Sequence, residues 1–243
     1  MITNRDAGTS IDEIAEGIYR ISTPVVRPVG AFSFNQYLIL DEEPLLFHTG
    51  LRRLFPLVSE AIAAAMPVEK LRYVSFSHHE ADETGALDEF LRLAPDSVPL
   101  CGRIAAMVSI ADIALRAPRA LDDGEEVSLG RHRVRWFYTP HLPHAWECGF
   151  LMEESTRTLL CGDLFTQGGA HHPALTEADI LEPSEAFRKE TDYYSHTRGG
   201  ARMIERLAAN EPETLACMHG PAWKGEGGRL LRALGERLDR EGA

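Results

Sequence analysis

The sequence predicts an α/β protein in which two β-sheets are packed between helical layers. Segments with strand character and segments with helical periodicity alternate in two blocks, and each block begins rich in strands and ends in helices. No Gly/Ser-rich linker separates the two blocks, and 243 residues are enough to bury one large core. We therefore expect a single domain that covers residues 1–243.

The first block contains three expected strands that precede a helix, followed by another strand and helix. The strands Phe34–Asp41 and Pro44–Gly50 share the turn "DEEP", and Ile18–Thr23 precedes them. A helix with the alanine-rich centre "EAIAAAM" follows over 57–66. The apolar strand Leu71–Ser77 then leads into a helix over Gly85–Ala94.

The second block repeats this order. Its expected elements are hairpins over Glu125–Pro140 and Gly149–Asp163, helices over Pro183–Ser195 and Ala201–Ala209, and a strand over Thr214–Gly220. A final helix carries a stripe of four leucines between positions 230 and 238. In both blocks, several expected strands end next to residues that could form a functional site.

Composition excludes several classes of function. The chain has 37 acidic and 25 basic residues, a net charge of −12, and its basic residues are scattered, so we expect no nucleic-acid partner. The N-terminal segment lacks a signal-peptide pattern and no apolar run is long enough to span a membrane, so we expect a cytoplasmic protein without a membrane partner. Four dispersed cysteines without C-x-x-C spacing are expected to be reduced thiols.

The stretch "SHHEADETGAL" begins where the strand Leu71–Ser77 ends, and it is rich in possible metal ligands. His78, Glu80 and Asp82 alternate, so on an extended loop their side chains can project to one side, whereas Glu83 breaks the alternation. Loops that follow strands are where open α/β sheets place their chemistry. We therefore predict that His78, Glu80 and Asp82 are metal ligands.

Three further residues occur in the same context, each just beyond an expected strand. They are His141 in "TPHLPH", Asp163 in "CGDLF" and His219 in "CMHGP". Together with the first three they offer six nitrogen and oxygen donors, enough for two metal ions that share one carboxylate. A single histidine of this kind is more often a surface residue, and the prediction depends on the repeated context.

Three residues near these motifs are candidates for supporting roles. His144 and Glu147 follow His141 closely, so either could reach the site and fix the tautomer of a ligating imidazole, although His144 could equally cap its own loop. Glu83 is either such a partner or an additional ligand.

The ordered set H-x-E-x-D, H-x-P, G-D and H-G resembles the metallo-β-lactamase fold superfamily, and within it the flavodiiron and oxygen-binding diiron proteins. The resemblance implies a four-layer αββα sandwich with two metals at the edge of its sheets. It implies that His78, Glu80 and His141 bind one iron, that Asp82 and His219 bind the other, and that Asp163 bridges them. Two positions depart from the family pattern: Glu83 stands where histidine is usual, and His48 stands where many members have aspartate.

The ligand types favour iron over zinc. Imidazoles mixed with carboxylates and no thiolate suit iron or manganese, although zinc or manganese could replace iron. Two ferrous ions carry four positive charges and Glu80, Asp82 and Asp163 supply three negative ones, which leaves one positive charge for an anionic bridge. If Glu83 also binds, the reduced centre becomes neutral.

The resemblance implies a function in binding and reducing dioxygen or nitric oxide, as a sensing module or as a reductase. Two ferrous ions supply two electrons, too few to convert dioxygen to water, so a reductase needs an unidentified electron donor. The sequence has no glycine-rich flavin loop, and we expect no FMN within this chain. The alternative is a dinuclear hydrolase of an ester, lactone or thioester. A homodimer is compatible with the sequence on general grounds.

Overall fold

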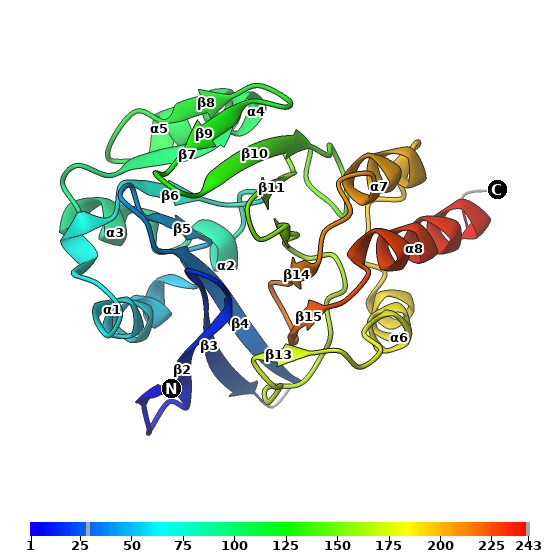
Figure 1. Cartoon of the computed structure of the whole chain (residues 1–243), viewed down its shortest axis with the longest axis horizontal. Helices are drawn as coiled ribbons and strands as arrows, with labels where there is room; N and C mark the ends of the chain where they lie inside the picture. Colours follow the sequence, from blue (N-terminus) through cyan, green and yellow to red (C-terminus); the bar gives the residue numbers. More distant parts are fainter. Residues whose placement is uncertain (28–29, 242–243) are drawn as a thin grey trace.

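The computed structural model describes residues 1–27 and 30–241, and it has four layers in the order α, β, β, α (Figure 1). Helices α1 (Phe55–Ala63) and α3 (Leu87–Leu93) cover one sheet, and α7 (Gly200–Ala208) and α8 (Gly227–Glu241) cover the other. The predicted αββα fold class is confirmed.

Within the described residues, the first sheet has eight strands in the order of the chain, β1 to β8. Strands β1 to β5 are antiparallel, and β5 to β8 are parallel. The bounds are β1 Ile2–Asn4, β2 Thr9–Ala15, β3 Ile18–Arg27, β4 Gly30–Ile39, β5 Leu45–Phe47, β6 Tyr73–Ser75, β7 Val98–Gly102 and β8 Arg119–Leu121.

The second sheet has seven strands in the order β13, β15, β14, β12, β11, β10, β9 in the part of the chain that the structure describes. Its strands are β9 Glu126–Ser128, β10 Arg133–Tyr138, β11 Gly149–Glu153, β12 Thr158–Leu160, β13 Leu175–Thr176, β14 Thr214–Ala216 and β15 Ala222–Lys224. Strands β12 and β14 are parallel neighbours with Leu160 opposite Ala216, although 53 residues separate the two strands along the chain. This pairing brings two of the predicted motifs to one edge.

The other helical segments are short, apart from α6. They are η1 Arg52–Leu54, η2 Val68–Lys70, α2 Ala81–Thr84, α4 Arg103–Ala105, η3 Ala106–Ile110, α5 Ala111–Ile113 and α6 Leu181–Thr191. Among the described residues, no helix is both long and apolar enough to cross a membrane.

Alternation along the strands divides the apolar side chains between two faces of each sheet. In β4, Leu38 packs toward α1 and α3, whereas Tyr37 and Ile39 pack between the sheets. In β11, Leu151 lies between the sheets and Phe150 packs toward the opposite helical layer. The two sheets are therefore buried on both faces, as a four-layer sandwich requires.

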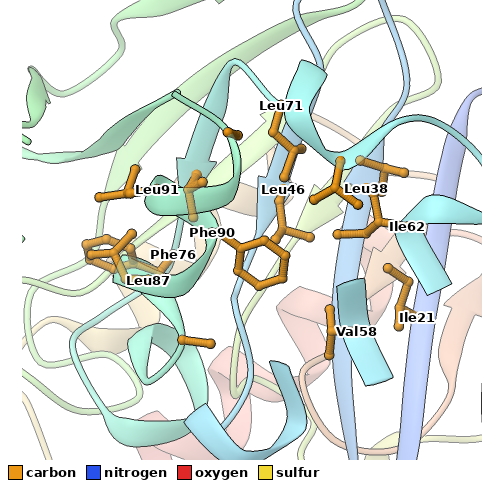
Figure 2. Close-up of a cluster of buried hydrophobic side chains, with 14 of the residues drawn as sticks. Ile21, Leu38, Leu46, Val58, Ile62, Leu71, Phe76, Leu87, Phe90 and Leu91 are labelled. Atoms are coloured by element: carbon orange, nitrogen blue, oxygen red, sulfur yellow. The ribbon is translucent and has the colours of Figure 1, made fainter. Parts of the chain in front are cut away.

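Figure 2 shows the core between the first sheet and its helices. Val58 and Ile62 from α1 and Phe90 from α3 are fully buried and lie near Leu38 and Leu46 of the sheet. Side chains from α1 and α3 thus share one core with the strands. This packing fixes α3, and with it the short segment between β6 and α3 that carries the first motif.

Glu153, a buried carboxylate on β11, should make the free energy of unfolding depend on pH independently of the predicted metal site. Glu153 accepts hydrogen bonds from Nδ1 of His132 at 3.0 Å, from the Ser155 amide at 2.9 Å and from the Thr156 amide at 2.8 Å. Burial raises the pKa of Glu153, but the hydrogen bonds from Thr156, Ser155 and His132 outweigh burial and lower the pKa below its ordinary value.

We predict that Glu153→Gln lowers the free energy of unfolding by about 1–3 kcal/mol at pH 7. A lowered pKa in the folded state stabilises the protein above the pKa of the unfolded state, and this contribution is lost as the pH falls through the folded value. The difference between the variant and the original protein should therefore shrink below about pH 4. Urea unfolding at pH 7 and pH 3 measures this difference in the free energy of unfolding. Glu126→Gln, which removes an exposed carboxylate, is the control. An equal difference at both pH values would contradict this explanation.

Candidate metal centre

The predicted ligands come from the ends of three strands that the fold brings together. His78 follows β6 of the first sheet, while Asp163 and His219 follow the neighbouring strands β12 and β14 of the second. The amide of Gly149 donates to the carbonyl of Ser77 at 2.9 Å and joins the two sheets at this point. The site therefore lies at one edge of the sandwich, where both sheets contribute.

The first motif is not the extended loop that the sequence suggested. Glu80 has extended backbone angles, and the chain then turns into the short helix α2 at Ala81. Because of this turn, Asp82 and Glu83 are on adjacent positions of a helix, and Glu83 is directed inward with 1% of its side chain exposed. Glu80 is 52% exposed and marks the solvent side of the site.

His78, Glu80, His144 and Asp163 form the first group of donor atoms. Nε2 of His144 lies 2.9 Å from Nε2 of His78, 3.3 Å from Oε1 of Glu80 and 3.4 Å from Oδ2 of Asp163. Nε2 of His78 lies 3.7 Å from the same Asp163 oxygen. Atoms of His78, His144 and Asp163 lie close enough to one another to ligate one ion.

Asp82 and His219 form a second group on the other side of Asp163. Nε2 of His219 lies 3.3 Å from Oδ2 of Asp82 and 3.7 Å from Oδ1 of Asp163. The two oxygens of Asp163 therefore face different groups, Oδ2 the first and Oδ1 the second. A carboxylate in this position can bridge two ions.

Each of the three imidazoles is oriented by a hydrogen bond at Nδ1. The partners are Oγ of Ser77 for His78 at 2.9 Å, the carbonyl of Tyr193 for His144 at 3.1 Å, and the carbonyl of Ser33 for His219 at 2.8 Å. Donation from Nδ1 leaves the lone pair of Nε2 directed into the cluster, which is how ligating histidines are held. These three partners were not predicted from the sequence. Only Ser77 lies next to its histidine in the chain, so only this partner could have been suspected from the local sequence.

Several buried polar atoms of the cluster lack a partner, and this observation tests whether the residues fit metal ions. Among the described residues, Oδ1 of Asp163 and both carboxylate oxygens of Glu83 are buried without a hydrogen bond. The facing Nε2 atoms of His78 and His144 would repel each other unless a proton or a cation lay between them. Because cations would satisfy all of these acceptors, the residues fit a pair of metal ions.

The pKa values of two carboxylates in the cluster are shifted in opposite directions. Burial raises the pKa of Asp82, but the hydrogen bond and charge of His219 lower it to about 2. Burial together with the negative charge of Asp82 raises the pKa of Asp163, against the opposing effect of His219 and His144. Bound cations would replace protons as the counter-charge of these carboxylates.

The structure does not bring His141 into the cluster. His141 is exposed, has a left-handed backbone conformation with φ of 62°, and donates its amide hydrogen to the carbonyl of Ala145 at 2.8 Å. Its side chain lines a separate hollow of about 350 Å³, together with Arg198 and Leu238. The tight loop after β10 turns His141 away and His144 inward, so the position predicted for His141 is taken by His144.

Two other residues singled out from the sequence support the site without reaching its donor atoms. Oε1 of Glu147 accepts the amide hydrogen of His79 at 3.1 Å and so ties the His144 loop to the first motif. His48 is fully buried, with Nε2 at 2.9 Å from Oγ of Ser77, the hydroxyl that also contacts His78.

The surroundings leave the site open on one side and apolar on another. A surface hollow of about 550 Å³ is lined by Glu80, His79 and Thr84, among others. Phe32 and Phe34 pack edge-on against the imidazole of His219, with ring centroids 5.0 and 5.2 Å away. Glu80 therefore faces this hollow, whereas aromatic rings cover part of the His219 imidazole.

Comparison with known proteins identifies one family. The model of a family described as "ODP family beta lactamase" matches residues 32–220, which include all the residues of the cluster. The chain is 25% identical over 225 residues to a nitric oxide reductase of Moorella thermoacetica, which covers 86% of this chain and 54% of that protein. It is 25% identical over 211 residues to a rubredoxin-oxygen oxidoreductase of Megalodesulfovibrio gigas, covering 82% of this chain and 51% of the relative. The chain thus spans about half the length of these relatives.

Solved structures show the same fold. The flavodiiron protein from Giardia intestinalis superimposes with a TM-score of 0.79 and 20% identity, over 94% of this chain and 59% of that chain. At this level of identity the similarity establishes the αββα architecture.

Proposed function

The chain belongs to the ODP beta lactamase family, and from this premise we propose that it is a non-haem diiron protein that binds and reduces dioxygen or nitric oxide. Electrons would come from a separate donor. The proposed ligands are His78, Glu80, Asp82, His144, Asp163 and His219.

The position of Asp163 is the observation that carries the proposal. Its Oδ2 faces His78 and His144, and its Oδ1 faces His219, which lies beside Asp82. One shared carboxylate between two groups of nitrogen and oxygen donors is an arrangement for two ions rather than one. A structural ion pair would not leave Oδ1 buried without a hydrogen bond.

The donor types support iron as the native metal. The cluster offers imidazoles and carboxylates, and none of the four cysteines is among its donors, since all four are buried elsewhere as free thiols. Such a set suits iron or manganese, and it is less typical of zinc sites with thiolate or predominantly histidine ligands. When bound, two ferrous ions would supply one electron each to a small oxidant.

The protein's own groups would hold and orient this centre. The hydrogen bonds at Nδ1 of His78, His144 and His219 fix the direction of three ligating nitrogens before a metal arrives. The exposed side chain of Glu80 is the ligand next to the surface hollow, so it lies where a diatomic ligand would enter. Phe32 and Phe34 limit access of water to the His219 side.

Two electrons per centre do not complete the reduction of dioxygen to water, so the proposal includes a donor that returns electrons. The names of the two curated relatives, a nitric oxide reductase and a rubredoxin-oxygen oxidoreductase, support this reaction class.

The test is metal content together with oxygen response. Protein from iron-supplemented cells should contain about two irons per chain by plasma mass spectrometry, as expected for a dinuclear centre. Its near-ultraviolet and visible absorption should bleach on anaerobic reduction and return with dioxygen or with nitric oxide. Comparing the rates of return identifies the preferred oxidant.

The same experiment distinguishes the hydrolase alternative. The diiron proposal would be wrong if the protein contained two zinc ions, had no absorption band and did not respond to dioxygen after reconstitution with iron. Ester, lactone and thioester substrates would then be tested on the zinc-loaded protein.

A further inference from the structure

Glu83 is a buried carboxylate that the six proposed ligands leave without a role. Its side chain is 1% exposed, and neither oxygen has a hydrogen-bond partner among the described residues. Within residues 1–27 and 30–241 it pairs with no lysine or arginine. A buried carboxylate in this condition is costly, because the charge has lost its water without gaining a counter-charge.

The surroundings of Glu83 are those of the centre itself. Its Oε2 lies 3.8 Å from Nε2 of His78, and atoms of His78, Glu80 and Glu83 lie close enough together to hold one ion. The carboxylates of Asp163, Asp82 and Glu80 are the charged groups that act on it most strongly. Four carboxylates therefore lie close together. Their mutual repulsion is unfavourable unless a cation lies between them.

The backbone holds Glu83 in this inward position. Its carbonyl oxygen accepts hydrogen bonds from the Thr49 amide at 2.7 Å and from the Thr49 hydroxyl at 3.1 Å. Thr49 follows β5, so α2 is fastened to the end of a neighbouring strand of the first sheet. These contacts fix the backbone of α2 at Glu83, from which its side chain is directed into the protein with 1% exposed.

We propose that Glu83 is a direct metal ligand, the seventh of the centre. The inference rests on the diiron function proposed above and extends it, because it sets the charge of the centre. With Glu83 bound, Glu80, Asp82, Glu83 and Asp163 supply four negative charges, which neutralise two divalent ions. The additional negative charge stabilises the higher oxidation state of an oxidisable metal such as iron or manganese relative to its divalent state.

The experiment uses Mn²⁺ as the probe, since the divalent ion is stable in air and visible by electron paramagnetic resonance. Metal-free protein is titrated with Mn²⁺, and its melting temperature is measured with and without the metal. The original chain should bind two ions. Glu83→Gln should weaken binding of at least one ion by roughly tenfold or more.

The metal-free proteins provide a second readout with the opposite sign. Glutamine removes the cost of burying an ionisable carboxyl beside three others, so metal-free Glu83→Gln should melt at least about 2 °C above the metal-free original. Its gain in melting temperature on adding Mn²⁺ should be smaller. Glu69→Gln, which removes an exposed carboxylate on η2, is the matched control and should change neither result.

A third variant separates ligation from charge. Glu83→His retains a donor, so it should bind two ions, but it removes one negative charge, so the iron-loaded variant should have a higher midpoint potential than the original. If the original chain binds two ions and Glu83→Gln binds them equally tightly without a more stable metal-free state, the role of Glu83 is overturned and the diiron function stands. If the original chain binds no pair of ions, both proposals fail.

Discussion

His144→Ala is expected to weaken binding of one metal ion by at least about 100-fold, whereas His141→Ala should leave both ions bound. Nε2 of His144 lies within 3.4 Å of donor atoms of His78, Glu80 and Asp163, and its removal opens the first group. His141 lies in the same loop, but its side chain is exposed and lines a different hollow. Metal content per chain after gel filtration in metal-free buffer measures both variants.

The two histidines form a matched pair because they are three residues apart and of the same type. Loss of metal from His141→Ala with retention in His144→Ala would show that the loop adopts another conformation in the metal-bound protein. Circular dichroism of each variant ensures that metal loss is not caused by unfolding.

Asp163→Asn is expected to have the largest effect, because it breaks the carboxylate bridge that the two groups share. The metal content should fall from about two ions to fewer than one per chain, and the absorption response to dioxygen should disappear. Asparagine retains one oxygen, but its amide nitrogen cannot ligate, so one side of the bridge is lost whichever way the amide points. Plasma mass spectrometry and anaerobic reduction followed by exposure to air measure the two losses.

The metal-free form of Asp163→Asn should remain folded. Oδ1 of Asp163 has no hydrogen bond among the described residues, and the backbone carbonyl of Asp163 keeps the hydrogen bonds that it accepts from the hydroxyls of Thr166 at 2.9 Å and Tyr193 at 3.0 Å. Retention of two ions by a folded Asp163→Asn variant would refute the bridging role.

The layers and most strands of the fold could be predicted because local patterns specify them. The short apolar runs in 34–41 and 44–50 mark strands with two buried faces, and β4 and β5 lie there. The strands that were not predicted are β1, β2, β7, β8, β13 and β15. Strands β1, β8, β13 and β15 have only two or three residues, and β7 contains a proline, so these strands leave little periodicity to detect. Their pairing depends on the neighbouring strand rather than on their own sequence.

The candidate ligands His78, Asp163 and His219 could be located because each follows a strand at the same edge. The choice between His141 and His144 could not be made in this way. Both lie in one loop after β10, and the hydrogen bond from Nδ1 of His144 to the carbonyl of Tyr193 comes from a segment 49 residues away. Such a partner leaves no trace in the local sequence.

The sequence by itself determined the fold class, the mixed imidazole and carboxylate chemistry, and Asp163 as the residue predicted to be shared. The first two follow from periodicity and from residue type, which are local properties, whereas the shared role of Asp163 was implied by the resemblance of the ordered motifs to the flavodiiron proteins. Only the tertiary structure decided that Glu83 faces inward, that Glu80 faces solvent and that His144 completes the cluster. The physical reason is that the direction of a side chain depends on where the backbone turns, at α2 and in the loop after β10, and these turns are held by contacts with Thr49, His79 and Tyr193 from distant parts of the chain.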